Sequence, residues 1–380
     1  MAISWGNARD RSVATLAMLH AGIEPIFLAQ LADRGAVSLA SFGWVTGAGQ
    51  LGFSAGALLC CRARFASRHP AALAAAMVGV AASLSLALAR DLPSVLLLRL
   101  LLGLAMGLLF DRAAAAAAKE RPHRTIGIIM LGQQFLATVV MASLSLVGAR
   151  WGAATAIAML AAAPLTIALL TLLEREEADA EPQCPPERAC RAAVPPPPFS
   201  LLAAVLLIAT TMMVWSYIGA VGAGLHIDGA VAGLAIAAAS LASAPAALLA
   251  SFSAPRREPW ITALVCGGGI LMPLLLPATS GLTAYAGAMA LFNAGSTFAT
   301  IRFSAWAIAL CSGAEQRRNV WFAQTLATAA GTPLGAMAVG WDGLPALAVL
   351  CCICLAAAIA SAFARSGIVA PVTRLDLALR

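Results

Sequence analysis

The segment from residue 174 to residue 199 reads EREEADAEPQCPPERACRAAVPPPPF, and it differs in character from the sequence on either side of it. It is acidic at first and then rich in proline, with too few apolar residues to bury a core. On both sides, the chain runs in apolar stretches of about 20 residues, the length that a helix needs to cross a bilayer core of roughly 30 Å. The segment therefore predicts a mostly disordered cytoplasmic tether, extended along its proline run, between two hydrophobic halves.

The overall composition is that of a membrane protein. Of the 380 residues, 61% are hydrophobic and 11% are charged, whereas soluble proteins have about 45–50% apolar and about 25% charged residues. The mean hydropathy is +0.88. The net charge of +7 does not indicate a nucleic-acid partner, because membrane proteins carry excess Lys and Arg that set their orientation. The composition excludes a secreted, disordered or nucleic-acid-binding chain.

Reading from one charged cluster to the next predicts twelve transmembrane helices. None of the spans alternates apolar and polar residues, which favours helices over the strands of a β-barrel. The first span is long and contains His20 and Glu24, so we expect it to remain a helix rather than to be cleaved as a signal peptide. The expected spans are 12–32, 37–59, 71–89, 93–118, 125–149, 153–173, 200–225, 230–253, 260–277, 282–311, 320–341 and 344–364.

The basic residues predict the orientation of these spans. If the N-terminus is cytoplasmic, 18 Lys and Arg residues fall on the inner side, and only Arg34, Arg90 and Arg150 fall on the outer side. The positive-inside rule therefore places both termini in the cytoplasm. One missed or invented span would reverse the side of every later loop, so the asymmetry supports the count of twelve.

The tether divides the chain into domains. We expect an N-terminal six-helix bundle at residues 1–173, a cytoplasmic linker at 174–199, and a C-terminal six-helix bundle with a short cytoplasmic tail at 200–380. The fold class is thus an all-α polytopic membrane protein. Six helices plus six around a cytoplasmic loop is typical of transporters built from two related bundles, with a substrate site near the membrane midplane between them.

Two local patterns carry a family resemblance. Residues 56–65 read GALLCCRARF after the second span, and Arg99, Gly103 and Gly107 follow at a spacing of four in the fourth. In these patterns the chain resembles the major facilitator superfamily, whose corresponding loop reads Gly-x-Leu-Ala-Asp-Arg-x-Gly-Arg-Lys and whose helix four often shows Arg-x-x-x-Gly-x-x-x-Gly. The loop keeps the first Gly, the Leu and the late Arg, but it has Cys60 in place of the acidic residue and Ala63 in place of the second Gly.

The resemblance implies a fold of two six-helix bundles and transport of a small-molecule substrate. It also implies that the loop clasps a carboxylate at the inner end of helix four and so stabilises the outward-facing state. Asp111 would then pair with Arg62 or Arg64, and its other interpretation is solvation at a helix end. Arg112 either belongs to this gate or extends its charged group to the headgroup level of the membrane.

Five charged residues lie within the expected spans, and each is a candidate functional residue because burying an Arg or Asp there costs at least ~2.5–3.5 kcal/mol. They are Glu24, Arg99, Asp111, Arg112 and Arg302.

Glu24 is the strongest of these candidates. It lies about 18 Å into the first helix at 1.5 Å per residue, with His20 one turn earlier on the same face. Such a pair can hold a proton between its two groups, and Pro25 is expected to bend the helix beside the carboxylate. The sequence therefore predicts that His20 and Glu24 couple protons or contact substrate; the alternative is hydrogen bonding to neighbouring helices.

The remaining candidates complete the predicted site. Arg99 would tune the proton site or stabilise the packing of helix four. Arg302 would meet an anionic substrate, or pair with Asp111 as a gate, or serve structure alone. Polar residues that would line a cavity, or else bond between helices, are Gln133, Trp215, Tyr217, Asn293 and Gln324. Few amides and two tyrosines suit a weak acid or an amphiphile better than a sugar.

The sequence offers no support for chemistry driven by ATP or a metal. It contains no P-loop, GxSxG or HExxH motif, and we expect its nine cysteines to be reduced thiols. We therefore predict a proton-coupled secondary transporter, monomeric in a bacterial-type inner membrane, with no cofactor beyond the proton gradient and no partners other than its solute and the lipid bilayer. The alternatives are an uncoupled facilitator or multidrug-type efflux carrier and, in another class, a polytopic membrane enzyme or a non-transporting sensor.

Overall fold

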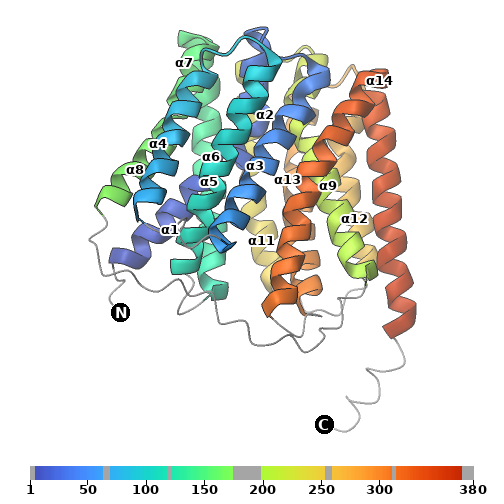
Figure 1. Cartoon of the computed structure of the whole chain (residues 1–380). Coiled ribbons are helices and arrows are strands. Elements are labelled where there is room, and N and C mark those ends of the chain that lie inside the picture. The colour runs from blue at the N-terminus through green and yellow to red at the C-terminus, as the bar shows by residue number, and fades with distance from the viewer. Residues whose placement is uncertain are drawn as a thin grey trace. The chain divides into compact units, whose positions relative to one another are not determined.

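The computed structural model describes residues 5–62, 69–117, 122–173, 198–252, 259–309 and 314–369. All regular structure in these ranges is helical, which confirms the all-α class (Figure 1). The chain falls into two compact units. Unit 1 comprises Met1–Cys190 with Ser216–Leu241, and unit 2 comprises Arg191–Trp215 with Ala242–Arg380. Residues 216–241 thus group with unit 1, although we expected them in the C-terminal bundle; the predicted tether itself lies outside the described residues.

Unit 1 contains the first half of the chain and one later hairpin. Its helices are α1 (Trp5–Ala17), α2 (Leu19–Asp33), the short η1 (Leu39–Ser41), α3 (Phe42–Arg62), α4 (His69–Leu86), α5 (Leu92–Ala117), α6 (Pro122–Trp151), α7 (Ala153–Met159), α8 (Ala162–Leu172), the last turns of α9 (Pro198–Gly224) and α10 (Gly229–Ser240).

Unit 2 contains the remaining helices. They are the first part of α9, α11 (Ser243–Phe252), α12 (Pro259–Leu271), the short η3 (Met272–Leu275), α13 (Leu282–Ala309) and α14 (Ala314–Val369). Trp215 of α9 stacks on Phe292 of α13, with ring centroids 5.6 Å apart. Within the described residues, eight helical stretches are long and apolar enough to cross a membrane. The chain is therefore a multi-pass membrane protein, and the count of twelve spans stays a prediction.

Prolines interrupt two of the helices that we expected to be continuous, within the expected spans 153–173 and 230–253. A proline at position i cannot donate to the carbonyl of residue i−4. The break between α7 and α8 includes Leu160, four residues before Pro164, and the break between α10 and α11 includes Leu241, four residues before Pro245. In α14 the backbone leaves the helical region at Asp342 and Gly343, just before Pro345, at the boundary that we expected between the spans 320–341 and 344–364.

The first helix is also interrupted, but not where we expected. The interruption lies at Met18, between α1 and α2, and Pro25 lies inside α2. The helix is therefore not broken beside Glu24, and the expected bend at Pro25 stays a prediction. The loss of the proline's hydrogen bond does not explain a break seven residues earlier. The Met18 N–H still donates to the Ala14 carbonyl at 3.2 Å, so the two helices follow one another closely.

Glycines bring α3 and α5 into backbone contact, side by side in Figure 1. A Cβ atom at Gly52 would lie 2.2 Å from the Leu100 carbonyl oxygen, and one at Gly103 would lie 2.1 Å from the Gly49 carbonyl oxygen. Distances this short leave no room for a side chain, so the glycines permit the close approach. The register between α3 and α5 is consequently fixed around Arg99.

Polar contacts attach residues 216–240 to the rest of unit 1. The Thr138 and Ser240 hydroxyl groups lie 2.6 Å apart, joining α6 to α10. The Ser216 hydroxyl donates to the Thr46 hydroxyl at 3.2 Å, and the Gly43 N–H donates to the Tyr217 hydroxyl, also at 3.2 Å. These bonds explain why the later hairpin groups with the first half of the chain.

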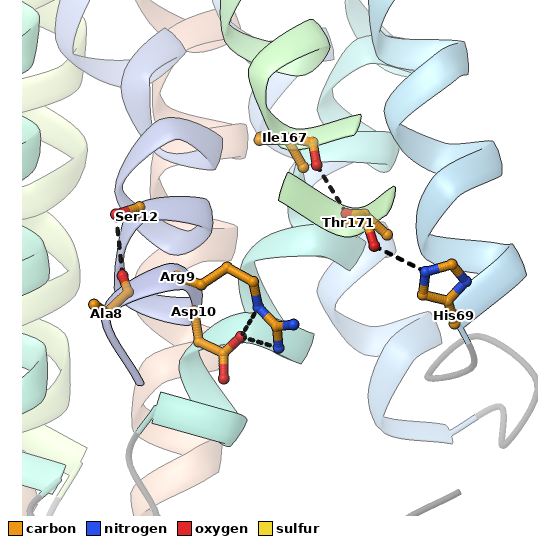
Figure 2. Close-up of polar contacts among 7 residues, drawn as sticks. All are labelled: Ala8, Arg9, Asp10, Ser12, His69, Ile167 and Thr171. Carbon is orange, nitrogen blue, oxygen red and sulfur yellow. Dashed lines mark hydrogen bonds and ion pairs between the residues drawn. The ribbon is translucent and has the colours of Figure 1, made fainter. Parts of the chain in front are cut away.

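Further polar contacts lie near the start of α1 and between α4 and α8. Arg9 pairs with Asp10 at 2.9 Å, and the Ser12 hydroxyl donates to the Ala8 carbonyl at 3.0 Å. Nε2 of His69 donates to the Thr171 carbonyl at 2.8 Å, which ties the first residue of α4 to the end of α8 (Figure 2).

Candidate functional site

An ion pair between Glu24 and Arg99 lies in the interior of unit 1. Glu24 comes from α2 and Arg99 from α5, and Nη2 of Arg99 donates to Oε1 of Glu24. Their side chains are 0% and 3% exposed, respectively. The two charges lie 75 residues apart in the sequence, so only the packing of the helices brings them together.

The guanidinium group of Arg99 is held by two further neighbours. Its central carbon lies 4.8 Å from the centre of the Phe27 ring, one turn beyond Glu24 on α2. On α3, a Cβ atom at Gly49 would lie 2.8 Å from Nη2 of Arg99 and 3.2 Å from Nε. Gly49 therefore makes room for the guanidinium, while the aromatic ring offers a favourable face to the cation.

Several polar atoms of this cluster lack a partner in the described part of the chain. They are Oε2 of Glu24, Nε of Arg99 and both ring nitrogens of His20, and all are buried. His20 therefore does not share a hydrogen bond with Glu24 in this structure, although we expected the two residues to form a proton-holding pair. The carboxylate pairs with Arg99 instead, because a guanidinium offers a full positive charge and a fixed donor geometry.

Gln133, one of the predicted lining residues, packs against α2, the helix that carries Glu24. It is buried on α6, and a Cβ atom at Gly22 would lie 2.4 Å from its amide nitrogen. Gln133 therefore packs against the backbone of α2 two residues before Glu24. Its role as a lining residue stays a prediction.

The other predicted lining residues lie elsewhere. Tyr217 is fully buried in unit 1, where it stacks on Phe42 at 5.9 Å. Trp215 belongs to the stack in unit 2. The amide of Asn293 donates to the Met289 carbonyl of its own helix, and the Ser304 hydroxyl donates to Oε1 of Gln324. These contacts are of the interhelical and intrahelical kind that we named as the alternative, and they leave a lining role as a prediction.

The predicted gate residues are only partly described. Arg64 lies outside the described residues, and of Arg62 only the backbone is described, at the end of α3. Asp111 and Arg112 are half-buried on α5 in unit 1, whereas Arg302 is half-buried on α13 in unit 2. The clasp and the gate between Asp111 and Arg302 accordingly stay predictions.

Sequence reasoning missed Phe27 and Gly49 and did not pair Arg99 with Glu24. Phe27 follows Glu24 at a spacing of three, which places it on the same helix face. Gly49, Gly52 and Gly56 recur at spacings of three and four in the second span, as do Gly103 and Gly107 in the fourth. Matching these two stripes would have predicted contact between α3 and α5.

Solved structures with the same fold are transporters. The chain resembles the nucleoside transporter NupG with a TM-score of 0.71 at 12% identity, covering 95% of this chain and 98% of that one. A bacterial homologue of the human lysosomal transporter Spinster, inward-facing and occupied, gives 0.66 at 15% identity, covering 95% and 94%. The POT family transporter PepTSo gives 0.70 at 11% identity, covering 96% and 97%. At such identities the likeness establishes the fold.

Sequence comparison establishes the family. Residues 12–336 match the Major Facilitator Superfamily, and the chain belongs to that superfamily. A search of curated proteins gives no significant match. Membership of this family, together with the transporter fold, places the chain among transporters rather than enzymes.

Proposed function

We propose that this protein is a proton-coupled secondary transporter that carries a small organic weak acid or amphiphile by alternating access. In this proposal twelve helices form two bundles in a bacterial-type inner membrane, both termini are cytoplasmic, and the protein works as a monomer. The substrate site lies near the midplane, and alternating access exposes it to each side in turn. The driving force is the proton gradient, without a bound cofactor.

The buried pair of Glu24 and Arg99 carries the proposal. A buried ion pair is weak evidence for stability, because desolvation of the two charges offsets much of their attraction. An ionisable group within a membrane span is more often retained for function. Glu24 is also a group that can gain and lose a proton, whereas Arg99 keeps its charge. The pair therefore offers one site with two charge states, which a proton-coupled cycle requires.

Transport into liposomes tests the proposal. The purified chain is reconstituted, a pH gradient is imposed, and the membrane potential is clamped with potassium and valinomycin. Labelled lactate, nicotinate and hippurate serve as weak acids, tetraphenylphosphonium as the amphiphile, and sucrose as a neutral sugar. We expect gradient-driven accumulation of a weak acid or of the amphiphile but not of sucrose, relative to protein-free liposomes.

Variants make this test specific for the site. Glu24→Gln should abolish accumulation but leave exchange of labelled for unlabelled solute, because the amide keeps the shape of the carboxyl group and cannot carry the proton. Asp33→Asn is the matched control, since Asp33 is an exposed acid at the end of the same helix, and it should accumulate solute as the wild type does. Unchanged accumulation by Glu24→Gln would show that coupling does not run through this residue.

A further inference from the structure

The positive charge of Arg99 is balanced by one negative charge, that of Glu24. Of the acidic residues whose side chains the structure describes, Glu24 alone is buried. Within unit 1, the described partner of Arg99 is therefore a single carboxylate, and together the two groups carry no net charge. An arginine does not lose its proton in a protein, so any change of charge at this site must occur on Glu24, on His20 or on a ligand.

The unpartnered atoms show that the cluster has unused hydrogen-bonding capacity. Oε2 of Glu24, Nε of Arg99 and both ring nitrogens of His20 are buried without a partner among the described residues. Buried polar groups in proteins are nearly always bonded, so a group left unbonded calls for an explanation, such as a ligand or a second arrangement of the site. Here the spare donor lies on the cation, and a spare acceptor lies on the anion.

From these contacts we propose that Arg99 binds a monovalent carboxylate in exchange for Glu24, and that Glu24 takes up one proton for each carboxylate bound. The inference rests on the proposed transport function and names its substrate class and its stoichiometry. A carboxylate matches a guanidinium because it accepts two parallel N–H bonds, so it can replace the Glu24 side chain and also use the spare Nε.

Charge balance fixes the proton count. If a carboxylate were to bind while Glu24 stayed ionised, two buried anions would face one cation, and one of them would be unpaired at a large desolvation cost. Uptake of one proton from water by Glu24 removes the excess charge. The loaded site then holds one cation and one anion, as the empty site does. No bond of the solute changes, and release of the carboxylate returns the proton to water.

His20 provides an acceptor for the proton that Glu24 receives. It lies one turn before Glu24 on the same face of α2, and its ring nitrogens have no partner in the described residues. A neutral imidazole has one acceptor nitrogen, so the protonated carboxyl group of Glu24 can donate to it. Phe27 contributes an apolar ring beside the guanidinium, which favours a carboxylate with an apolar body.

The other acidic and basic groups carried by α2 and α5 themselves lie at other levels along these helices. Asp33 on α2 is about 14 Å from Glu24, and Asp111 and Arg112 on α5 are about 18–20 Å from Arg99, at 1.5 Å per residue. The titratable groups described on the helices that pack against α2 and α5, and on the attached end of α9, are Arg9, Asp10, Arg11, Cys60, His69, Arg150 and Tyr217. Arg9 pairs with Asp10, His69 bonds the Thr171 carbonyl, and Arg150 lies over the Trp151 ring.

Binding measured against pH tests the proposal. Lactate, nicotinate and hippurate are titrated into the purified full chain by calorimetry between pH 5.5 and 8, with nicotinamide and hippuramide as uncharged counterparts. Because one proton is taken up per carboxylate, the Kd should rise about tenfold for each unit of pH while Glu24 is ionised in the empty site. The amides should bind more weakly than the acids.

Two variants separate the exchange from general effects. In Glu24→Gln the cation has no competing carboxylate, so the carboxylates should bind with an affinity independent of pH. In the double variant Glu24→Gln with Arg99→Gln, which leaves no unpaired charge behind, binding of carboxylates should be lost. A pH-independent Kd in the wild type, equal binding of the amides, or no binding of any carboxylate would overturn the proposal.

The outcomes also separate this inference from the proposed function. If tetraphenylphosphonium is accumulated in a Glu24-dependent way and no carboxylate binds, the chain is a proton-coupled transporter and the carboxylate exchange is wrong. If carboxylates bind with uptake of one proton in the wild type and independently of pH in Glu24→Gln, but Glu24→Gln still accumulates them, the exchange stands and the proposed coupling of transport through Glu24 is wrong.

Discussion

At the scale of single residues, the interior of unit 1 depends on the mutual neutralisation of Glu24 and Arg99. Removing one member of a buried pair leaves the other charge without compensation, which costs about 3–5 kcal/mol. Replacing both members by amides leaves polar but uncharged groups. The two kinds of change should therefore differ strongly in stability, even though the single change alters fewer atoms.

We expect Arg99→Gln to lower the thermal unfolding temperature in detergent far more than the double variant Glu24→Gln with Arg99→Gln does. The single variant leaves the Glu24 carboxylate, whose side chain is 0% exposed, without its ion-pair partner. Thermal unfolding followed by tryptophan fluorescence measures the difference. Equal losses in the two proteins would show that the Glu24 carboxylate is neutralised without Arg99, by a proton or by another group.

Gly49 is expected to position Arg99. In Gly49→Ala the new methyl group would lie 2.8 Å from Nη2, and the flexible arginine must move away from Glu24, at a cost of about 1–3 kcal/mol for overpacking. Gly52→Ala is the comparison, because its methyl group would meet the backbone of α5 at Leu100 rather than a side chain. We predict a smaller loss of stability in Gly49→Ala than in Gly52→Ala, but a larger change in the pH dependence of transport.

A shorter cation supplies the control for Gly49. Arg99→Lys removes the Nη2 and Nε atoms that the methyl group would meet, so adding it to Gly49→Ala should restore part of the pH dependence. If Gly49→Ala transports with the pH profile of the wild type, Gly49 serves packing alone and does not position Arg99.

The sequence was sufficient to single out Glu24 and Arg99, but not to pair them. Both are ionisable residues in apolar stretches, which is a local property that a sequence displays. Their contact depends on how α2 and α5 pack across 75 residues of chain. His20 was chosen as the partner of Glu24 because neighbours one turn apart on a helix are the only proximity that a single sequence shows directly.

At the scale of helices, prolines and glycines decide where the predicted spans are interrupted. The sequence predicted helices in the right places from length and apolarity. It did not predict the breaks before Pro164 and Pro245, because membrane helices often tolerate proline without interruption. Pro333 is an example of a tolerated proline. It lies inside α14, which is interrupted at Asp342 and Gly343 and not at Pro333.

Gly343 should be the least replaceable residue of the interruption in α14. Its φ of 66° and ψ of −153° lie in a region that is essentially restricted to glycine. Gly343→Ala should therefore destabilise the protein by about 1–3 kcal/mol. Gly340→Ala is the matched control, three residues earlier, where a Cβ atom would meet nothing within 4 Å. Thermal unfolding should show a loss only for Gly343→Ala, and equal behaviour would contradict the assigned strain.

Asp91 caps the start of α5, the helix that carries Arg99. Its carboxylate accepts from the Ser94 N–H and from the Ser94 hydroxyl, both at 2.9 Å. These two bonds, the backbone bond first, hold the pKa of Asp91 below its usual value. A lowered pKa in the folded protein means that the cap stabilises α5 above the unfolded pKa of about 3.9, and that this contribution is lost as pH falls through the folded value.

The unfolding temperatures of the wild type and Asp91→Ala should therefore differ by a constant amount from pH 8 to pH 5. The difference should shrink only below about pH 4, where the wild-type carboxylate gains its proton. A difference that already shrinks between pH 7 and pH 5 would show that another group titrates with the cap.

At the scale of the whole molecule, the sequence predicted the family and the all-helical class, both of which are confirmed. The grouping of residues 216–241 with unit 1 could not be predicted, because it depends on contacts such as the one between Thr138 and Ser240. Hydroxyl groups in apolar helices carry no sequence signal for their partners. The orientation of the chain follows from its loop charges and stays a prediction.

Reporter fusions test the predicted orientation. Alkaline phosphatase fused after Arg90 or Arg150 should be active, because both residues are expected on the outer side. Green fluorescent protein fused after Arg175 or after Arg380 should fluoresce, because these residues are expected in the cytoplasm. An active phosphatase after Arg175 would contradict the predicted topology, because it would require either an odd number of spans in the first half of the chain or the opposite orientation.

Proton movement recorded together with solute uptake addresses the role of Glu24 most directly. Liposomes containing the purified chain and a trapped pH-sensitive dye receive labelled weak acid or tetraphenylphosphonium while solute and internal pH are followed at the same time. If Glu24 carries the coupled proton, solute flux in the wild type will change the internal pH in proportion, and Glu24→Gln will exchange solute with no change in internal pH beyond that of protein-free liposomes. Proton movement that persists in Glu24→Gln would place the coupling elsewhere.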